Sequence, residues 1–154
     1  MKYVINISNH ALSFMIWFPI LGGIFIAIQK PEGSNAKVMA LAVAAICFFS
    51  SLVALVHFDS SAAAMQFTER YSWIAVFKIE YFLGVDGISL PLIVLTTFTT
   101  ILVIGAGWNV ISDRPNLYLG SFLILEGIMI GVFAALDAAL FYVFWEANRQ
   151  LVFR

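Results

Sequence analysis

Two acidic residues lie inside long apolar stretches of the sequence. Glu126 belongs to "LGSFLILEGIMIGVF" and Glu146 belongs to "ALFYVFWEANRQ". A charged acid near the centre of a bilayer costs about 3 kcal/mol on insertion scales, so it usually faces a protein interior or water. Because such surroundings favour the protonated form, an acid there can take up and release a proton. We predict that both are proton-relay residues. The alternatives are a protonated acid that hydrogen-bonds a neighbouring helix and an acid at the membrane interface.

Glu126 has only apolar neighbours on its own predicted helix. The positions three, four and seven residues away hold leucine, isoleucine, methionine and phenylalanine. Residues at these spacings share one helix face, so any partner of Glu126 must come from another helix. Gly127 and Gly131 form a G-x-x-x-G pattern beside it, extended by Gly120 and Ala134. This pattern favours the close approach of a second helix.

Glu146 follows Asp137 by nine positions, and Asp137 can cap the helix that carries it. At 1.5 Å per residue, Glu146 lies roughly 13 Å along that helix, near the middle of a membrane. Arg149 and Gln150 come three and four positions later, on the same helix face. An ion pair with Arg149 would keep Glu146 charged.

The composition indicates an integral membrane protein. Of the 154 residues, 62% are hydrophobic and 11% are charged, whereas soluble domains have about 25% charged residues. Cys47 is the single cysteine, so neither a disulfide nor an iron–sulfur cluster can form within the chain. The sequence has no glycine-rich nucleotide-binding loop and no His/Cys cluster at metal spacing. We expect no cofactor site in this chain and no nucleic-acid partner.

The acids must be positioned by membrane-spanning helices, each of which needs roughly 20 predominantly apolar residues. We predict an all-α integral membrane protein with about five transmembrane helices, the fifth incomplete, in a single membrane domain over residues 1–154. The predicted helices are at about 11–28, 38–57, 89–108, 117–136 and 138–153.

The connection between the second and third helices is the one long extramembrane segment. From Phe67 to Leu83 the odd positions are apolar or aromatic, while many of the even positions are polar. The alternation predicts a short β-hairpin, although Glu69, Ile74 and Val76 break it. The hairpin could clasp a neighbouring subunit, or it could be an aromatic belt at the lipid headgroups.

Two long motifs resemble a known family. "LGVDGISLPLIVLTTF" (Leu83–Phe98) and "LEGIMIGVFAALDAALFYVFWE" (Leu125–Glu146) are similar to the subunit M type of antiporter-like subunit in respiratory complex I, the proton-pumping NADH:quinone oxidoreductase. The early "WFPILGG" (Trp17–Gly23) and the hairpin-like stretch also fit that family. The resemblance covers almost the whole chain up to Glu146.

The resemblance implies that Glu146, which follows "FW" in the fifth helix, is the central ionisable residue of a proton half-channel. It extends more loosely to Glu126 on the fourth helix. It also implies proton translocation coupled to electron transfer from NADH to quinone in other subunits. Flavin and iron–sulfur clusters would belong to those subunits. The implied partners are the other membrane subunits of complex I and the lipid of a bacterial or mitochondrial inner membrane.

The sequence departs from the family after Glu146, where "ANRQLVFR" replaces an apolar continuation that leads to many further helices. We therefore expect a truncated or frame-shifted N-terminal fragment of a longer subunit, without the lysines that exchange charge with the glutamate. Two alternatives stay open: a subunit of an Mrp-type sodium/proton antiporter, and a membrane scaffold fragment with no transport.

Overall fold

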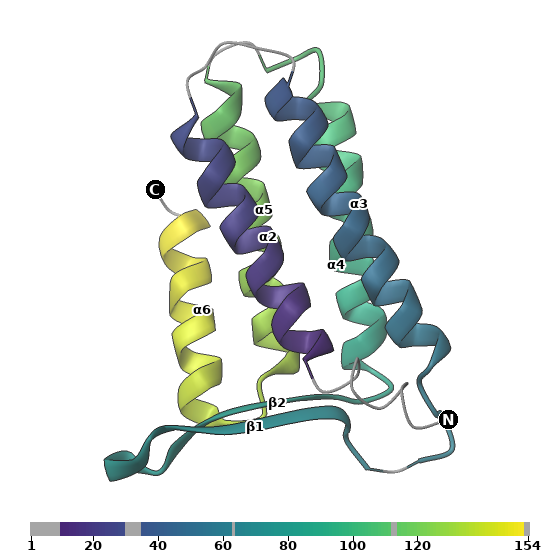
Figure 1. The fold of residues 1–154 in the computed structure, drawn as a ribbon, viewed down its shortest axis with the longest axis vertical. Helices are drawn as coiled ribbons and strands as arrows, with labels where there is room; N and C mark the ends of the chain where they lie inside the picture. The colour runs from purple at the N-terminus through teal and green to yellow at the C-terminus, as the bar shows by residue number, and fades with distance from the viewer. Residues whose placement is uncertain (1–9, 30–34, 63, 112–113, 153–154) are drawn as a thin grey trace.

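The computed structural model describes residues 10–29, 35–62, 64–111 and 114–152 as a bundle of helices with a β-hairpin across one end (Figure 1). The elements in chain order are α2 (Ala11–Ile28), α3 (Asn35–Val56), β1 (Gln66–Ile74), the short 3-10 helix η1 (Ala75–Phe77), β2 (Ile79–Val85), α4 (Ser89–Ala106), α5 (Pro115–Ala134) and α6 (Ala138–Val152). The predicted membrane class is confirmed, with a hairpin between the second and third long helices and a fifth, shorter helix.

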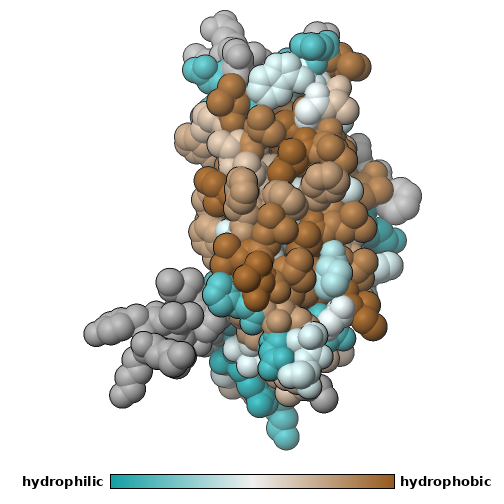
Figure 2. All heavy atoms as spheres, turned by 90° about the vertical axis from the view of Figure 1, so that its right-hand side faces the viewer, coloured by the Kyte–Doolittle hydropathy of each residue, from teal (hydrophilic) through white to brown (hydrophobic). Residues whose placement is uncertain are grey.

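Four of the helices within the described residues, α2, α3, α4 and α5, are long and apolar enough to cross a membrane. Figure 2 shows a band of hydrophobic side chains around the middle of the bundle, with hydrophilic residues at the hairpin end and at the opposite end. The helix α6 has 15 residues, so it is about 22 Å long, which is shorter than the roughly 30 Å of hydrocarbon.

The second helix begins at Asn35, three residues before the predicted start. Ala36, Ala40 and Ala44 recur at four-residue spacing and are all buried. The buried face of α3 therefore extends beyond the strongly apolar run from which its start was predicted.

The helices α2 and α5 pack with their backbones nearly in contact. A Cβ atom added to Gly23 would lie 2.6 Å from the carbonyl oxygen of Gly120, and one added to Gly120 would lie 2.6 Å from the carbonyl oxygen of Gly23. Farther along α5, a Cβ on Gly127 would lie 2.4 Å from the Ile16 carbonyl oxygen. The predicted close helix approach is thus made by Gly120 and Gly127, seven residues apart on one face of α5.

Gly131 faces a different neighbour. A Cβ added there would lie 2.7 Å from the ring of Phe144 on α6. The predicted ridge of small residues therefore serves two helices, with Gly120 and Gly127 against α2 and Gly131 against α6.

A carboxylate from the hairpin caps the N-terminus of α2. Glu69 on β1 is 2% exposed, and its Oε1 accepts hydrogen bonds from the backbone N–H groups of Leu12 at 2.9 Å and Ser13 at 3.1 Å. The Ser13 hydroxyl donates to Oε2 of the same carboxylate. The first N–H groups of a helix have no partner within the helix, and its N-terminus favours negative charge. Glu69 therefore breaks the predicted alternation because its carboxylate caps a helix from a distant part of the chain.

The other strand of the hairpin is held by the connection between α5 and α6. The N–H of Leu136 donates to the carbonyl oxygen of Phe82 at 2.9 Å. The backbone N–H of Glu80 donates to the Asp137 carboxylate at 3.4 Å. Both strands are thus tied to the helix bundle, each at a separate helix terminus.

Asp137 caps α6, as the sequence predicted. Its Oδ1 accepts hydrogen bonds from the N–H groups of Ala139 at 2.8 Å and Leu140 at 3.2 Å. The donation from Leu140 is the main cause that lowers the pKa of Asp137 below its usual value; burial opposes it, and the N–H groups of Glu80 and Ala139 contribute further. The start of α6 and the start of β2 therefore share one ionised carboxylate.

The segment "VDGIS" is a reciprocal cap ahead of α4. The Asp86 carboxylate accepts from the N–H of Ser89 at 2.7 Å, and the Ser89 hydroxyl accepts from the N–H of Asp86 at 2.9 Å. This is the arrangement of a capping box, in which each side chain satisfies the other residue's backbone donor. The backbone N–H and the hydroxyl of Ser89 lower the pKa of Asp86, so the cap is charged at neutral pH.

We expect Gly127→Ala to destabilise the chain and Gly105→Ala not to. The added methyl group at position 127 meets the α2 backbone, whereas nothing lies within 4 Å of a Cβ at Gly105. Overpacking costs about 1–3 kcal/mol, while an exposed helix glycine replaced by alanine gains up to about 1 kcal/mol. Thermal unfolding of the chain in mild detergent measures both. Equal unfolding midpoints for the two variants would contradict the close α2–α5 contact.

We expect Glu69→Ala to lower the free energy of unfolding by about 1–3 kcal/mol, because it leaves buried N–H groups of α2 without an acceptor. Glu80→Ala on the same hairpin is the matched control. Its carboxylate pairs with Arg70 at 2.6 Å, with side-chain exposures of 33% and 64%, and exposed pairs contribute about 0–1 kcal/mol. A larger loss for Glu80→Ala than for Glu69→Ala would refute the cap.

Candidate functional site

Glu126 lies in the middle of α5 and is 2% exposed. Within the part of the chain that the structure describes, neither of its carboxylate oxygens has a hydrogen-bond partner. The predicted partner from another helix is therefore not among these residues. A buried polar group without a partner is costly, and in native proteins it often marks a functional position.

The neighbour of Glu126 that sequence reasoning missed is Cys47. This thiol on α3 is fully buried and lies close enough to Glu126 for an electrostatic interaction between the two groups. No pattern of residues could have identified it, since a lone cysteine in an apolar run is typical of a small buried side chain.

Glu146 is in the opposite situation on α6. Its Oε1 accepts from Nη2 of Arg149 at 2.6 Å and its Oε2 accepts from Nε at 3.1 Å. Nε2 of Gln150 donates to Oε1 at 3.2 Å. The predicted ion pair on one helix face is confirmed, and the Glu146 side chain is 31% exposed. Two parallel N–H···O bonds from one guanidinium make a strong and well-oriented pair.

The two acids lie at similar depth on neighbouring helices. Glu126 is eight residues from the end of α5 at Ala134, and Glu146 is nine residues after the cap at Asp137. Since both helix ends meet the hairpin (Figure 1), each acid lies about 12–14 Å along its helix from that end. Glu146 is paired within its own helix and Glu126 is not, and no hydrogen bond joins the two acids in the described chain.

The hydroxyl groups of α4 do not form a continuous polar path. Thr96, Thr97, Thr99 and Thr100 each donate to a carbonyl oxygen one turn earlier, at 2.8–3.1 Å. Such bonds to the preceding turn are the usual role of threonine hydroxyls within a helix. Thr97 also lies 3.0 Å from the hydroxyl of buried Ser51 on α3, a contact between helices that the sequence did not predict.

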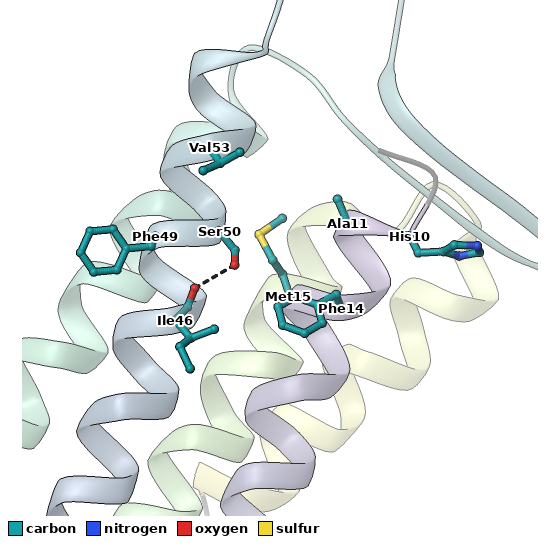
Figure 3. A pocket seen from close by; sticks show the side chains of 8 residues that line it. All are labelled: His10, Ala11, Phe14, Met15, Ile46, Phe49, Ser50 and Val53. Atoms are coloured by element: carbon teal, nitrogen blue, oxygen red, sulfur yellow. Dashed lines mark hydrogen bonds between the residues drawn. The ribbon is translucent and has the colours of Figure 1, made fainter. Parts of the chain in front are cut away.

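A cavity of about 600 Å³ lies between α2 and α3 at the hairpin end (Figure 3). Its walls are mainly apolar, with Met15 and Phe14 on one side and Phe49 and Val53 on the other. The hydroxyl of Ser50 donates to the Ile46 carbonyl oxygen of its own helix at 2.8 Å. The cavity is therefore suited to hydrocarbon, and neither acid lines it.

Among the described residues, no group of three or more His, Cys, Asp or Glu side chains could hold a metal ion. Carboxylic acids such as Glu126 and Glu146 can exchange protons with groups brought next to them.

A model of the family described as NADH-ubiquinone oxidoreductase chain 4, amino terminus, matches residues 12–134. The match covers α2 to α5, the hairpin and Glu126. The chain belongs to this chain 4 family. Glu146 lies twelve residues beyond the matched segment, so the family model does not cover it.

Individual relatives agree with the family. The chain is 42% identical over 146 residues to NADH-quinone oxidoreductase subunit M of Rhodobacter capsulatus, covering 91% of this chain and 28% of the relative. It is 40% identical over 137 residues to NADH-ubiquinone oxidoreductase chain 4 of Arabidopsis thaliana, covering 88% and 28%. It is also 44% identical over 96 residues to F(420)H(2) dehydrogenase subunit M of Methanosarcina mazei, covering 62% and 19%.

The chain spans little more than a quarter of the length of the first two of these relatives. The apolar helices and the membership of the chain 4 family together make it an integral inner-membrane protein. The names of these relatives are those of quinone oxidoreductase or dehydrogenase subunits. They favour the chain 4 family over an Mrp-type antiporter.

We expect the segment of α6 to insert into a membrane less efficiently than the segment of α5. Residues 138–152 span about 22 Å and carry Glu146 and Arg149, whereas residues 115–134 span about 30 Å. Each segment is placed in a host protein between glycosylation sites, and the fraction inserted is read from the glycosylation pattern. Equal insertion would show that α6 spans a bilayer without help from neighbouring helices.

Proposed function

We propose that the chain is the N-terminal part of a proton-translocating membrane subunit of respiratory NADH:quinone oxidoreductase. Membership of the chain 4 family supports the assignment to the complex. The observation that supports proton movement is the pair of acids at similar depth, one buried without a hydrogen-bond partner among the described residues and one ion-paired.

In this proposal Glu146 is the main relay residue and Glu126 the second. Glu146 stays charged while it is paired with Arg149. It therefore accepts a proton only when that ion pair opens or another cation replaces the guanidinium. Glu126 has no such cation among the described residues, so its neutral, protonated form is the stable one in hydrocarbon. An acid held neutral and an acid held charged on adjacent helices can act as proton donor and proton acceptor in one path.

The chain performs no redox chemistry in this proposal. Flavin, iron–sulfur clusters, NADH and quinone belong to partner subunits, and this chain couples to them through the other membrane subunits of the complex. Its contribution is one part of a proton path, and the helices of the longer subunit complete that path.

The test uses a full-length relative that carries the same "FWE" motif, such as a bacterial subunit M in its assembled complex. We expect glutamine at the position of Glu146 to abolish NADH-driven proton pumping into membrane vesicles, while native gels still show the assembled complex. Glutamine at the position of Glu126 is expected to reduce pumping as well. Glutamine at the position of Glu80, outside the helices, is the control and leaves pumping unchanged.

Unchanged pumping in the Glu146 variant would remove the relay role, and loss of the assembled complex would favour the scaffold alternative. The chain of 154 residues alone, reconstituted in liposomes with a pH-sensitive dye, is expected to conduct no protons. Conduction by this chain alone would contradict the need for further helices.

A further inference from the structure

A second cavity, of about 480 Å³, lies between the hairpin and the facing sides of α2 and α6. Its hairpin wall is formed by Tyr71 and Trp73 of β1 and Tyr81 of β2, and Trp17 closes it from α2. The α6 wall is apolar and consists of Leu140, Val143 and Phe144. The cavity therefore has an aromatic wall on the hairpin and α2 and an apolar wall on α6.

Three polar groups of the aromatic wall, on Trp17, Tyr71 and Tyr81, already have partners within the protein. Nε1 of Trp17 donates to the hydroxyl of Tyr81 at 3.2 Å, and that hydroxyl lies 3.0 Å from the Ser13 hydroxyl. The Tyr71 hydroxyl lies 3.3 Å from Nδ1 of His10. A ligand in the cavity therefore meets mainly the rings of these aromatic side chains, and ring faces attract cations through their negative quadrupole.

The charges around the cavity also favour a cation. Among the described residues, no lysine or arginine lines it, and the buried Glu69 carboxylate lies close enough to Tyr81 to act on it electrostatically. Arg70 on the same strand is neutralised by Glu80 at 2.6 Å.

The position along the membrane normal matches a lipid. Trp17 lies seven residues after His10, and Phe144 lies seven residues after Asp137, so the cavity extends about 10 Å from the hairpin into the helix bundle. We propose that it binds one phospholipid with an ammonium headgroup, such as phosphatidylcholine or phosphatidylethanolamine. The ammonium group lies against Trp17, Tyr71, Trp73 and Tyr81, and an acyl chain lies along Leu140, Val143 and Phe144.

The test compares lipids that share a phosphate but differ in the ammonium group. The chain of 154 residues is reconstituted in vesicles of equal parts phosphatidylcholine and phosphatidylglycerol, extracted in mild detergent, and its bound lipid is counted by native mass spectrometry. We expect one retained phosphatidylcholine, with about tenfold preference over phosphatidylglycerol, because several ring contacts to one cation act together. Equal retention of the two lipids would overturn the headgroup assignment.

Two tryptophan variants form a matched pair. Trp73 in the cavity is 52% exposed and Trp145 outside it is 51% exposed, so both substitutions remove a half-exposed ring. We expect Trp73→Leu to abolish the preference and Trp145→Leu to keep it, with unchanged helical circular dichroism in both. Tyr71→Leu is a second variant in the cavity with the same expected loss. An equal preference in the wild-type chain and in both cavity variants would show that the aromatic wall does not recognise the lipid.

Discussion

The contact between the backbones of α2 and α5 at Gly23 and Gly120 determines the arrangement of the other elements. It places α5 against α2, and α5 also packs on α3, α4 and α6, so α5 becomes the central helix of the described bundle. Without a hydrophobic driving force between helices in lipid, close van der Waals packing of small residues is the main attraction available. The same central position surrounds Glu126 with protein. The burial of this acid is thus a result of glycine spacing on its own helix.

The two acids differ in burial and in ion pairing because their helices have different neighbours. The central helix α5 gives its acid no access to solvent or to a cation among the described residues. By contrast, α6 packs on α5 and β2, with buried residues at Leu140 and Phe144, and leaves its other faces open. Glu146 therefore depends on Arg149 of its own helix. A longer relative has further helices that can lie against this open face, and the cation next to Glu146 can then come from elsewhere.

The fold could be predicted from the sequence because membrane helices and strand alternation leave direct signals in hydropathy. The helix cap at Asp137 and the pairing of Glu146 with Arg149 could also be predicted, since both are local in sequence. Contacts between distant segments could not. The role of Glu69 depends on where β1 crosses the start of α2, the division of the glycine ridge depends on the rotation of α5, and the proximity of Cys47 to Glu126 depends on how α3 and α5 pack.

The anchors of the hairpin have a consequence for the order of events during synthesis. A two-stranded hairpin is at best marginally stable alone. Glu69 bonds to residues 56 and 57 positions before it, whereas Phe82 bonds to Leu136, 54 positions after it. The first strand can therefore dock as soon as it leaves the translocation machinery, but the second strand must wait until the connection after α5 has emerged. The hairpin is half-attached throughout the insertion of α4 and α5, and its exposed aromatic side chains are available to chaperones or to aggregation during that interval.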